Sequence, residues 1–169
     1  MQLHWEILDR KRKNLLHKLA FLKEEGFYLA EGTGLALQLG HRKSLDFDFY
    51  KKERFNPEEI QKELISTLGP KHVEPVQSTK GFLEVHIKSI EITFFFYPYN
   101  IIKLQEVHFG SIASIEDIAA MKLIAIVQRG TKRDFIDIYC LIKHIGLKKM
   151  FDAVQKKYPG YNIYSNRHK

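Results

Sequence analysis

The stretch of residues 28–49 constrains the fold of this chain more than any other segment. It begins with an apolar run typical of a strand, and a Gly-Thr turn then leads into a short helical segment at 33–39. It ends in a second predicted strand that carries Asp46 and Asp48. Successive side chains of a strand point to opposite faces, so we expect both carboxylates on one face and the apolar side chains of Leu45, Phe47 and Phe49 on the other.

The Asp46–Asp48 pair favours a metal site. Two carboxylates side by side on a strand repel each other unless a cation lies between them. Mg²⁺ prefers oxygen ligands and keeps coordination positions open for phosphate oxygens. Because the residues that alternate with the aspartates are apolar, we expect the strand to lie in a core with its acidic face forming the floor of a cleft. The pattern therefore indicates phosphoryl or nucleotidyl transfer, and the alternative is a pair of solvated surface aspartates.

Composition places the chain among ordinary globular proteins. Its 169 residues suffice for one domain with a core, and its hydrophobic and charged contents are 44% and 28%. No apolar run reaches membrane-spanning length, and the N-terminus lacks the pattern of a signal peptide. A single cysteine, Cys140, excludes an intrachain disulfide. We therefore expect a cytoplasmic protein with no membrane partner.

The net charge of +7 favours anionic partners. Basic residues gather at 10–13, 41–43 and 129–133. Nucleotides, nucleic acid or an acidic protein would all suit such clusters, and the alternative is that lysines on helix faces serve solubility. The chain shows no RNA-binding motif in which aromatic residues alternate with basic ones, so the sequence leaves nucleic-acid binding open.

Periodicity and capping signals predict an α+β order of elements. Asn56, Ser114 and Thr131 each resemble an N-cap at the start of a helix. We predict helices at about 5–25, 33–39, 56–68, 115–128 and 131–145, and strands near 27–30, 45–50, 72–77, 82–88 and 91–97, with Pro98 ending the sheet.

The two late helices carry a second group of candidate functional residues. Lys122 lies in the middle of an almost wholly apolar helix, where an ammonium group must either extend to solvent or meet an anion such as a phosphate or the acidic pair. Asp134 and Asp137 lie near the start of the next helix. They either compensate the helix dipole and pair with Arg129, or act as a general base and a positioning group. We expect the apolar side chains of that helix to be buried, namely Phe135, Ile138, Tyr139, Ile142 and Ile145.

Two long motifs resemble a known family. The first runs from Glu31-Gly32-Thr33 to Asp48, and the second runs from Ser114 to Tyr139. Together they are similar to the AbiEii/AbiGii toxin family of nucleotidyltransferase-like proteins, within the polymerase-β-type superfamily, over roughly residues 21–141. The resemblance implies an α+β fold in which helices flank a small mixed sheet and C-terminal helices pack on it. It implies one domain over 1–169, with a core at about 21–100 and a helical portion at about 112–169.

The resemblance also implies an activity. It is Mg²⁺- or Mn²⁺-dependent transfer of a nucleotide from an NTP to an RNA, such as tRNA, or to a protein acceptor. Many members of the family act as toxins beside an antitoxin partner or in phage defence. Carried over by position, the resemblance implies that the nucleotide is bound by Gly32, Thr33, Arg42, Ser44 and Lys122. It implies that the metal is held by Asp46 and Asp48. The implied catalytic residues are Asp46, Asp48, Lys122 and Asp134.

The chain departs from the family pattern at two positions. Glu31 stands where the family usually has glycine, and Thr93 stands where a third metal carboxylate usually lies. Glu91, two residues earlier on the same strand face, is the fallback metal ligand. These departures keep two alternatives open. One is a catalytically degenerate relative that binds a nucleotide or a partner protein, and the other is a metal-dependent nuclease or phosphoesterase.

Overall fold

The computed structural model describes residues 2–161 and confirms the predicted α+β class. The chain divides into two compact units. Unit 1 comprises Met1–Pro98 with Leu104–Ala113, and unit 2 comprises Tyr99–Lys103 with Ser114–Lys169. Residues 162–169 of the predicted helical portion lie outside the described residues.

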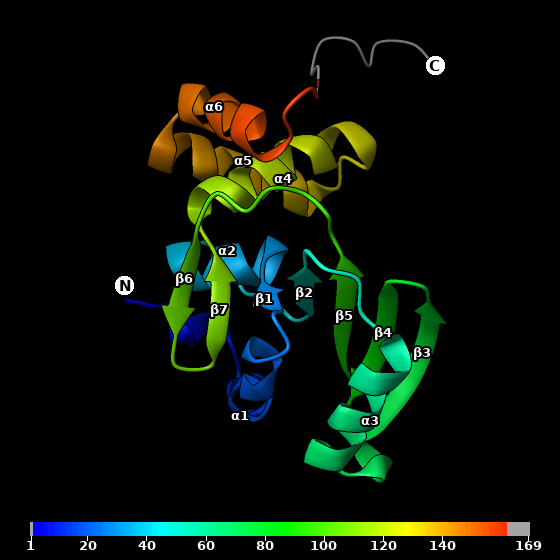
Figure 1. The fold of residues 1–169 in the computed structure, drawn as a ribbon. Coiled ribbons are helices and arrows are strands. Elements are labelled where there is room, and N and C mark those ends of the chain that lie inside the picture. The colour runs from blue at the N-terminus through cyan, green and yellow to red at the C-terminus, as the bar shows by residue number, and fades with distance from the viewer. Residues whose placement is uncertain (1, 162–169) are drawn as a thin grey trace. The chain divides into compact units, whose positions relative to one another are not determined.

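Unit 1 contains a mixed sheet of seven strands in the order β3-β4-β5-β2-β1-β7-β6 (Figure 1). The β2 strand lies between β1, which is antiparallel to it, and β5, which is parallel to it. The β7 strand is parallel to β1 on the other side. The strands are β1 (Tyr28–Leu29), β2 (Phe47–Lys51), β3 (Val73–Thr79), β4 (Phe82–Ile87), β5 (Ile90–Phe96), β6 (Leu104–Val107) and β7 (Gly110–Ala113).

The prediction that Pro98 ends the sheet is wrong, because β6 and β7 follow it. Each of these strands has four residues, which is too short for an alternating pattern to stand out in the sequence. The β7 strand is buried along its whole length, so its residues Gly110–Ala113 do not alternate between apolar and polar types.

The predicted N-terminal helix at 5–25 is divided into shorter pieces. They are a 3-10 turn at Trp5–Ile7, helix α1 at Arg10–Lys18 and a 3-10 turn at Ala20–Lys23. The Asp9 side chain accepts a hydrogen bond from the backbone N–H of Arg12, so it starts a new helix inside the predicted one. The leucines that recur along this segment near one helical stripe in the sequence, Leu8, Leu15, Leu19 and Leu22, are nevertheless all buried.

The other helices of unit 1 agree closely with the sequence prediction. Helix α2 (Glu31–Leu39) ends at Gly40, whose φ of 65° places it in the left-handed region that favours glycine. Helix α3 (Pro57–Leu68) has Asn56 as its N-cap, and the Asn56 side chain accepts a hydrogen bond from the Glu58 backbone. The α3 helix packs against β3.

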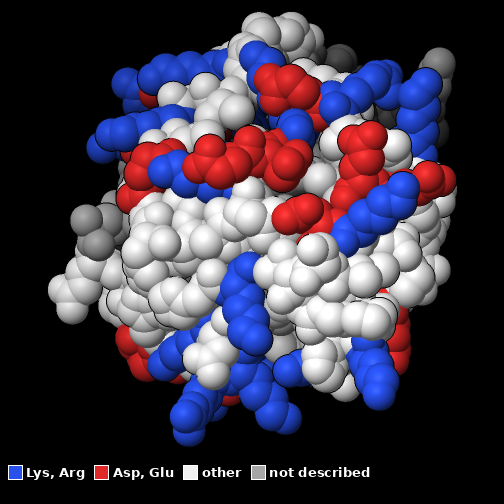
Figure 2. All heavy atoms as spheres, turned by 60° about the horizontal axis from the view of Figure 1, so that its bottom comes forward, with Lys and Arg blue, Asp and Glu red and all other residues white. Residues whose placement is uncertain are grey.

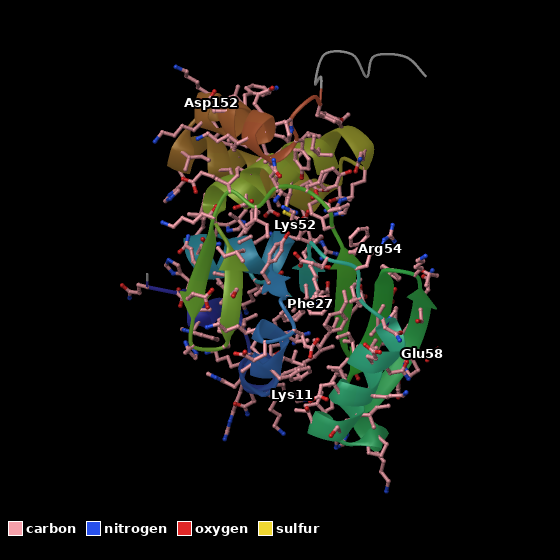
Figure 3. All side chains as sticks on the ribbon, in the orientation of Figure 1. Lys11, Phe27, Lys52, Arg54, Glu58 and Asp152 are labelled. Carbon is pink, nitrogen blue, oxygen red and sulfur yellow. The ribbon has the colours of Figure 1, made fainter. Side chains whose placement is uncertain are left out.

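The core of unit 1 lies on the apolar face of β2, β4 and β5. Phe47 and Phe49 are buried as predicted, whereas the predicted burial of Leu45 is wrong: it is 53% exposed, because the strand begins only at Phe47. Phe27, labelled in Figure 3, packs edge-on against Phe55 and Phe94 with ring centroids 5.0 and 5.3 Å away. Phe49 of β2 stacks on Phe94 of β5 with ring centroids 5.6 Å apart, which holds the two strands side by side and leaves Asp48 and Thr93 on the opposite face.

Unit 2 is helical, with α4 (Ile115–Gln128), α5 (Lys132–Ile145) and α6 (Leu147–Lys157) packed against one another. Ser114 and Thr131 cap α4 and α5 as predicted, while α6 was not predicted. Among residues 2–161, no helix combines the length and the apolar character needed to cross a membrane.

The predicted burial of the α5 side chains is wrong for most of the stripe. Phe135 and Tyr139 are 58% and 59% exposed, and Ile142 is exposed as well. The side chains that α5 buries are those of Asp134, Asp137 and Leu141. The helix turns these carboxylates inward because a buried lysine of α4 lies there to pair with them.

Candidate nucleotidyl-transfer site

In unit 1, a hydrogen-bonded contact joins the start of α2 to the segment that leads into β2. The buried Thr33 hydroxyl donates a hydrogen bond to the backbone carbonyl of Asp46. It also lies 2.6 Å from the Ser44 hydroxyl. Gly32 and Thr33, predicted to form a turn before the helix, instead lie in the first turn of α2, which is therefore held against the chain segment that carries the first aspartate.

Arg42, in the segment between α2 and β2, places its guanidinium against Gly32. A Cβ atom built on Gly32 would lie 2.6 Å from a terminal nitrogen of the Arg42 guanidinium, so only glycine leaves room for this approach. Arg42 also donates to the Lys43 carbonyl and to the Ser44 hydroxyl, at 3.2 and 3.5 Å. The structure thus brings together the predicted nucleotide-binding residues of unit 1, namely Gly32, Thr33, Arg42 and Ser44.

This arrangement suits a phosphate group. The N-terminus of α2 presents backbone N–H groups and the positive end of the helix dipole, which together favour anions. A guanidinium is planar and forms paired hydrogen bonds with phosphate oxygens.

Asp46 and Asp48 lie on the polar face that the sequence predicted. Both are partly buried, while Phe47 between them is fully buried. Asp48 is fixed at the backbone, where its carbonyl accepts a hydrogen bond from Ala30 at 3.1 Å. The β2–β5 register places Asp48 opposite Thr93, the residue that the resemblance aligns with the position of a third carboxylate.

The fallback ligand Glu91 lies beside other donors on this face. Its carboxylate gathers with the side chains of Glu84 and His86, with all three donor atoms within 4.8 Å of one another. Sequence reasoning did not single out Glu84 and His86. The alternation of polar and apolar residues in β4 was the signal that placed both on one face.

Glu31 has an unusual backbone conformation at the start of α2. Its φ is 52°, in the left-handed region that residues other than glycine rarely adopt, and its side chain is buried. The glycine that is usual at this position in the family is therefore what this backbone conformation favours.

In unit 2, Lys122 is buried among carboxylates. Its ammonium group lies 3.0 Å from the Asp134 carboxylate and 3.1 Å from the Asp137 carboxylate. Arg129 adds hydrogen bonds to both oxygens of Asp134, at 3.0 and 3.1 Å. Of the two interpretations of Lys122, extension to solvent is wrong, because the side chain is only 3% exposed.

Asp134 is held in its ionised form. Burial acts to raise the pKa of its carboxyl, but hydrogen bonds from Arg129, Thr131 and Lys122 outweigh burial and hold the pKa well below its usual range. The Thr131 hydroxyl donates to the carboxylate at 2.7 Å, and the Asp134 backbone N–H donates back to Thr131 in a capping box. Asp134 is therefore a weak base at neutral pH, and it positions the groups around it.

A second buried ion pair was missed by sequence reasoning. Asp117 lies 2.9 Å from the ammonium of Lys157, and both side chains are completely buried. The backbone N–H groups of Ile102 and Lys103 also donate to Asp117, which fixes that segment in unit 2. Lys157 belongs to α6, the helix that was not predicted, so no partner for Asp117 was expected from the sequence.

Comparison with known proteins agrees with this geometry. The family model described as "Nucleotidyl transferase AbiEii toxin, Type IV TA system" matches residues 15–166. An uncharacterised protein of Aquifex aeolicus, aq_aa25, is 34% identical over 159 residues, which are 89% of this chain and 76% of that protein.

Solved structures with a similar fold are nucleotidyltransferases. The antibiotic-resistance factor ANT(2'')-Ia aligns with a TM-score of 0.62 at 14% identity, over 86% of this chain and 90% of that one. A putative nucleotidyltransferase from H. pylori gives a TM-score of 0.62 at 20% identity, over 88% and 76%. The Megavirus polyadenylate synthase gives 0.59 at 17% identity, over 80% of this chain but only 32% of that enzyme.

These structural likenesses establish a nucleotidyltransferase-like fold, as the first motif predicted. The family match spans both motifs, the one around Asp46 and Asp48 and the one from Ser114 to Tyr139. The chain belongs to the AbiEii family of nucleotidyl transferase toxins.

Proposed function

We propose that this protein transfers a nucleotide from an NTP to an RNA or protein acceptor, with Mg²⁺ or Mn²⁺ as cofactor. It would act in the cytoplasm as the toxin of a toxin–antitoxin or phage-defence system. The contact between Thr33 and the Asp46 segment is the observation that carries the proposal. It holds a phosphate-binding helix start beside a strand that carries two carboxylates.

The donor set of unit 1 fits the cofactor. Asp46 and Asp48 offer hard oxygen donors from one strand face, which suit Mg²⁺ or Mn²⁺. When bound, the metal would neutralise charge on the phosphate oxygens of the NTP. The N–H groups of α2 and the guanidinium of Arg42 would bind the remaining phosphate oxygens and orient the chain of phosphates.

We propose distinct roles for two residues of unit 2. The family resemblance assigns Lys122 to phosphate binding, but its ammonium group is buried between Asp134 and Asp137, so we propose that it positions these two carboxylates. Because the pKa of Asp134 is depressed, we favour an orienting role for Asp134 over proton abstraction.

The charge on the protein surface supports the proposed kinds of acceptor. On the face in Figure 2, lysine and arginine side chains occur at several separate places with acidic side chains between them. Local basic groups of this kind suit contacts with the phosphates of a folded RNA, such as tRNA, or with acidic side chains of a protein. An antitoxin protein would be the regulatory partner.

A second function is favoured by one observation, the buried Glu31 at the start of α2. A carboxylate at this position places negative charge where a triphosphate would approach the backbone. A catalytically degenerate relative that binds a nucleotide weakly, or only a partner protein, would retain the fold and tolerate this residue.

Binding of the four NTPs with and without Mg²⁺, followed by calorimetry and thermal shift, tests the proposal. The variant Asp48→Asn removes a metal ligand with almost no change in shape, and Asp152→Asn on the exposed side of α6 is the matched control (Figure 3). We expect Mg²⁺-dependent stabilisation by at least one NTP, lost in Asp48→Asn and kept in Asp152→Asn. A ligand at one hundred times its dissociation constant stabilises by about 2.7 kcal/mol. Absence of binding by every NTP would instead support the partner-binding alternative.

A further inference from the structure

Three metal-ligating side chains converge on the polar face of the sheet of unit 1. Glu84 and His86 project from β4, and Glu91 projects from β5. One donor atom from each lies within 4.8 Å of the others. Glu84 and His86 are partly buried and Glu91 is exposed, so the group is open to solvent on one side.

Strand pairing fixes this convergence. The register places His86 directly opposite Glu91, and Glu84 opposite Thr93, so the three ligands occupy adjacent positions on one face. The connecting turn is tight, with Lys88 and Ser89 both at positive φ, which allows no slippage between the strands. Val85 and Ile92 are fully buried on the opposite face and hold the backbone in place.

The charges of the group point to a cation. Within residues 2–161, no lysine or arginine forms an ion pair with Glu84 or Glu91. Two carboxylates on neighbouring strands repel each other in the absence of a positive charge. A metal ion would remove this repulsion and take a ring nitrogen of His86 as a third ligand.

The ligand types select the class of metal. Imidazole together with carboxylate suits first-row transition metals, whereas Mg²⁺ and Ca²⁺ prefer oxygen ligands alone. Zinc binds both donor types at about 2.0–2.2 Å, so small side-chain rotations would bring the three donors to bonding distance. Three protein ligands would leave a coordination position open to water or another small ligand.

We propose that Glu84, His86 and Glu91 form a binding site for a transition-metal ion such as Zn²⁺, separate from the Asp46–Asp48 pair. In the sheet, Thr93 lies between Asp48 and Glu84, with Asp48 paired to it from β2 and Glu84 from β4. The ion would lie over β4 and β5 on the same face as Asp48, so Glu91 would serve this site and not act as the fallback ligand of the Asp46–Asp48 pair. The site does not depend on nucleotide transfer.

Zinc binding to the full chain, measured by calorimetry, tests this site, and Co²⁺ absorption reports the ligand geometry. We expect one Zn²⁺ bound per chain, with affinity at least tenfold weaker in His86→Ala and in Glu91→Gln. The controls are His72→Ala, an exposed histidine that follows α3, and Asp48→Asn at the other pair; both should bind Zn²⁺ as the wild type does. Because Glu91 is exposed, Glu91→Gln should fold normally even if His86→Ala does not.

The outcomes separate this proposal from the transferase proposal. No Zn²⁺ bound by the wild type, or affinity unchanged in both His86→Ala and Glu91→Gln, would overturn the metal site. Loss of Zn²⁺ in Asp48→Asn alone would place the ion at the aspartate pair and would also overturn it. Mg²⁺-dependent NTP binding is measured independently, so either proposal can fail while the other stands.

Discussion

At the scale of single residues, Glu31 shows a conflict between side chain and backbone. The backbone at this position has the left-handed conformation that glycine adopts readily, yet the residue is a buried glutamate. A residue other than glycine in this conformation costs about 1–2 kcal/mol relative to the right-handed region. Strain of this kind persists only where surrounding structure holds it, and here the turn is held by Thr33 and its hydrogen bond to the Asp46 carbonyl.

We predict that Glu31→Gly strengthens NTP binding severalfold. The change removes a negative charge from the helix start and relieves the backbone strain. We expect the free energy of unfolding to change by less than about 1 kcal/mol, because glycine also loses more conformational freedom on folding. Calorimetry with Mg²⁺ and NTP measures the affinity. Glu31→Gln is the control, because it removes the charge and keeps the strained backbone; weaker binding by Glu31→Gly would show that the glutamate contributes to the site.

At the scale of elements, α5 shows where sequence patterns mislead. The apolar stripe of this helix predicted which face is buried, but Phe135 and Tyr139 are exposed while Asp134 and Asp137 are buried. The periodicity shows only which side chains are apolar. The orientation of α5 instead follows its ion pairs with Lys122, and the sequence pattern does not show which residues are paired. The capping signals of α4 and α5 were correct because they depend only on residues a few positions apart.

The same network predicts an acid-dependent loss of stability. The pKa of Asp134 is lower in the folded protein than in the unfolded chain, so its stabilising contribution is complete above about pH 4. The contribution is lost as the pH falls from there towards the folded-state pKa, because the unfolded state binds the proton first. We expect Asp134→Asn to be less stable at neutral pH and to show a shallower decline in acid, by up to about 1.4 kcal/mol per pH unit.

Urea unfolding of the wild type and of Asp134→Asn between pH 5 and pH 2.5 measures this difference. Asp152→Asn, which changes an exposed aspartate of α6, is the control and should parallel the wild type. Equal slopes for Asp134→Asn and the wild type would mean that the ion-pair network does not stabilise the folded state in this way.

At the scale of the whole molecule, the sequence predicted the segment around β2 correctly but did not predict the later return of the chain to the sheet. The motif that ends in Asp48 was located correctly because alternation, the glycine turn and the acidic pair all lie within one segment of the chain. The return of Leu104–Ala113 to the sheet was not predicted, because β7 pairs with β1 across a long stretch of sequence. Contacts between distant segments leave little trace in local sequence patterns.

This return of the chain predicts how truncation affects the protein. A fragment of residues 1–113 keeps all seven strands, whereas a fragment of residues 1–98 lacks β6 and β7 and exposes the backbone of β1 as a sheet edge. An unpaired, fully buried strand such as β1 would pair with other molecules once its edge is free. We expect the shorter fragment to aggregate and the longer one to remain soluble with cooperative unfolding, as followed by size-exclusion chromatography and thermal melts. A soluble, cooperatively unfolding 1–98 fragment would contradict the assignment of Leu104–Ala113 to unit 1.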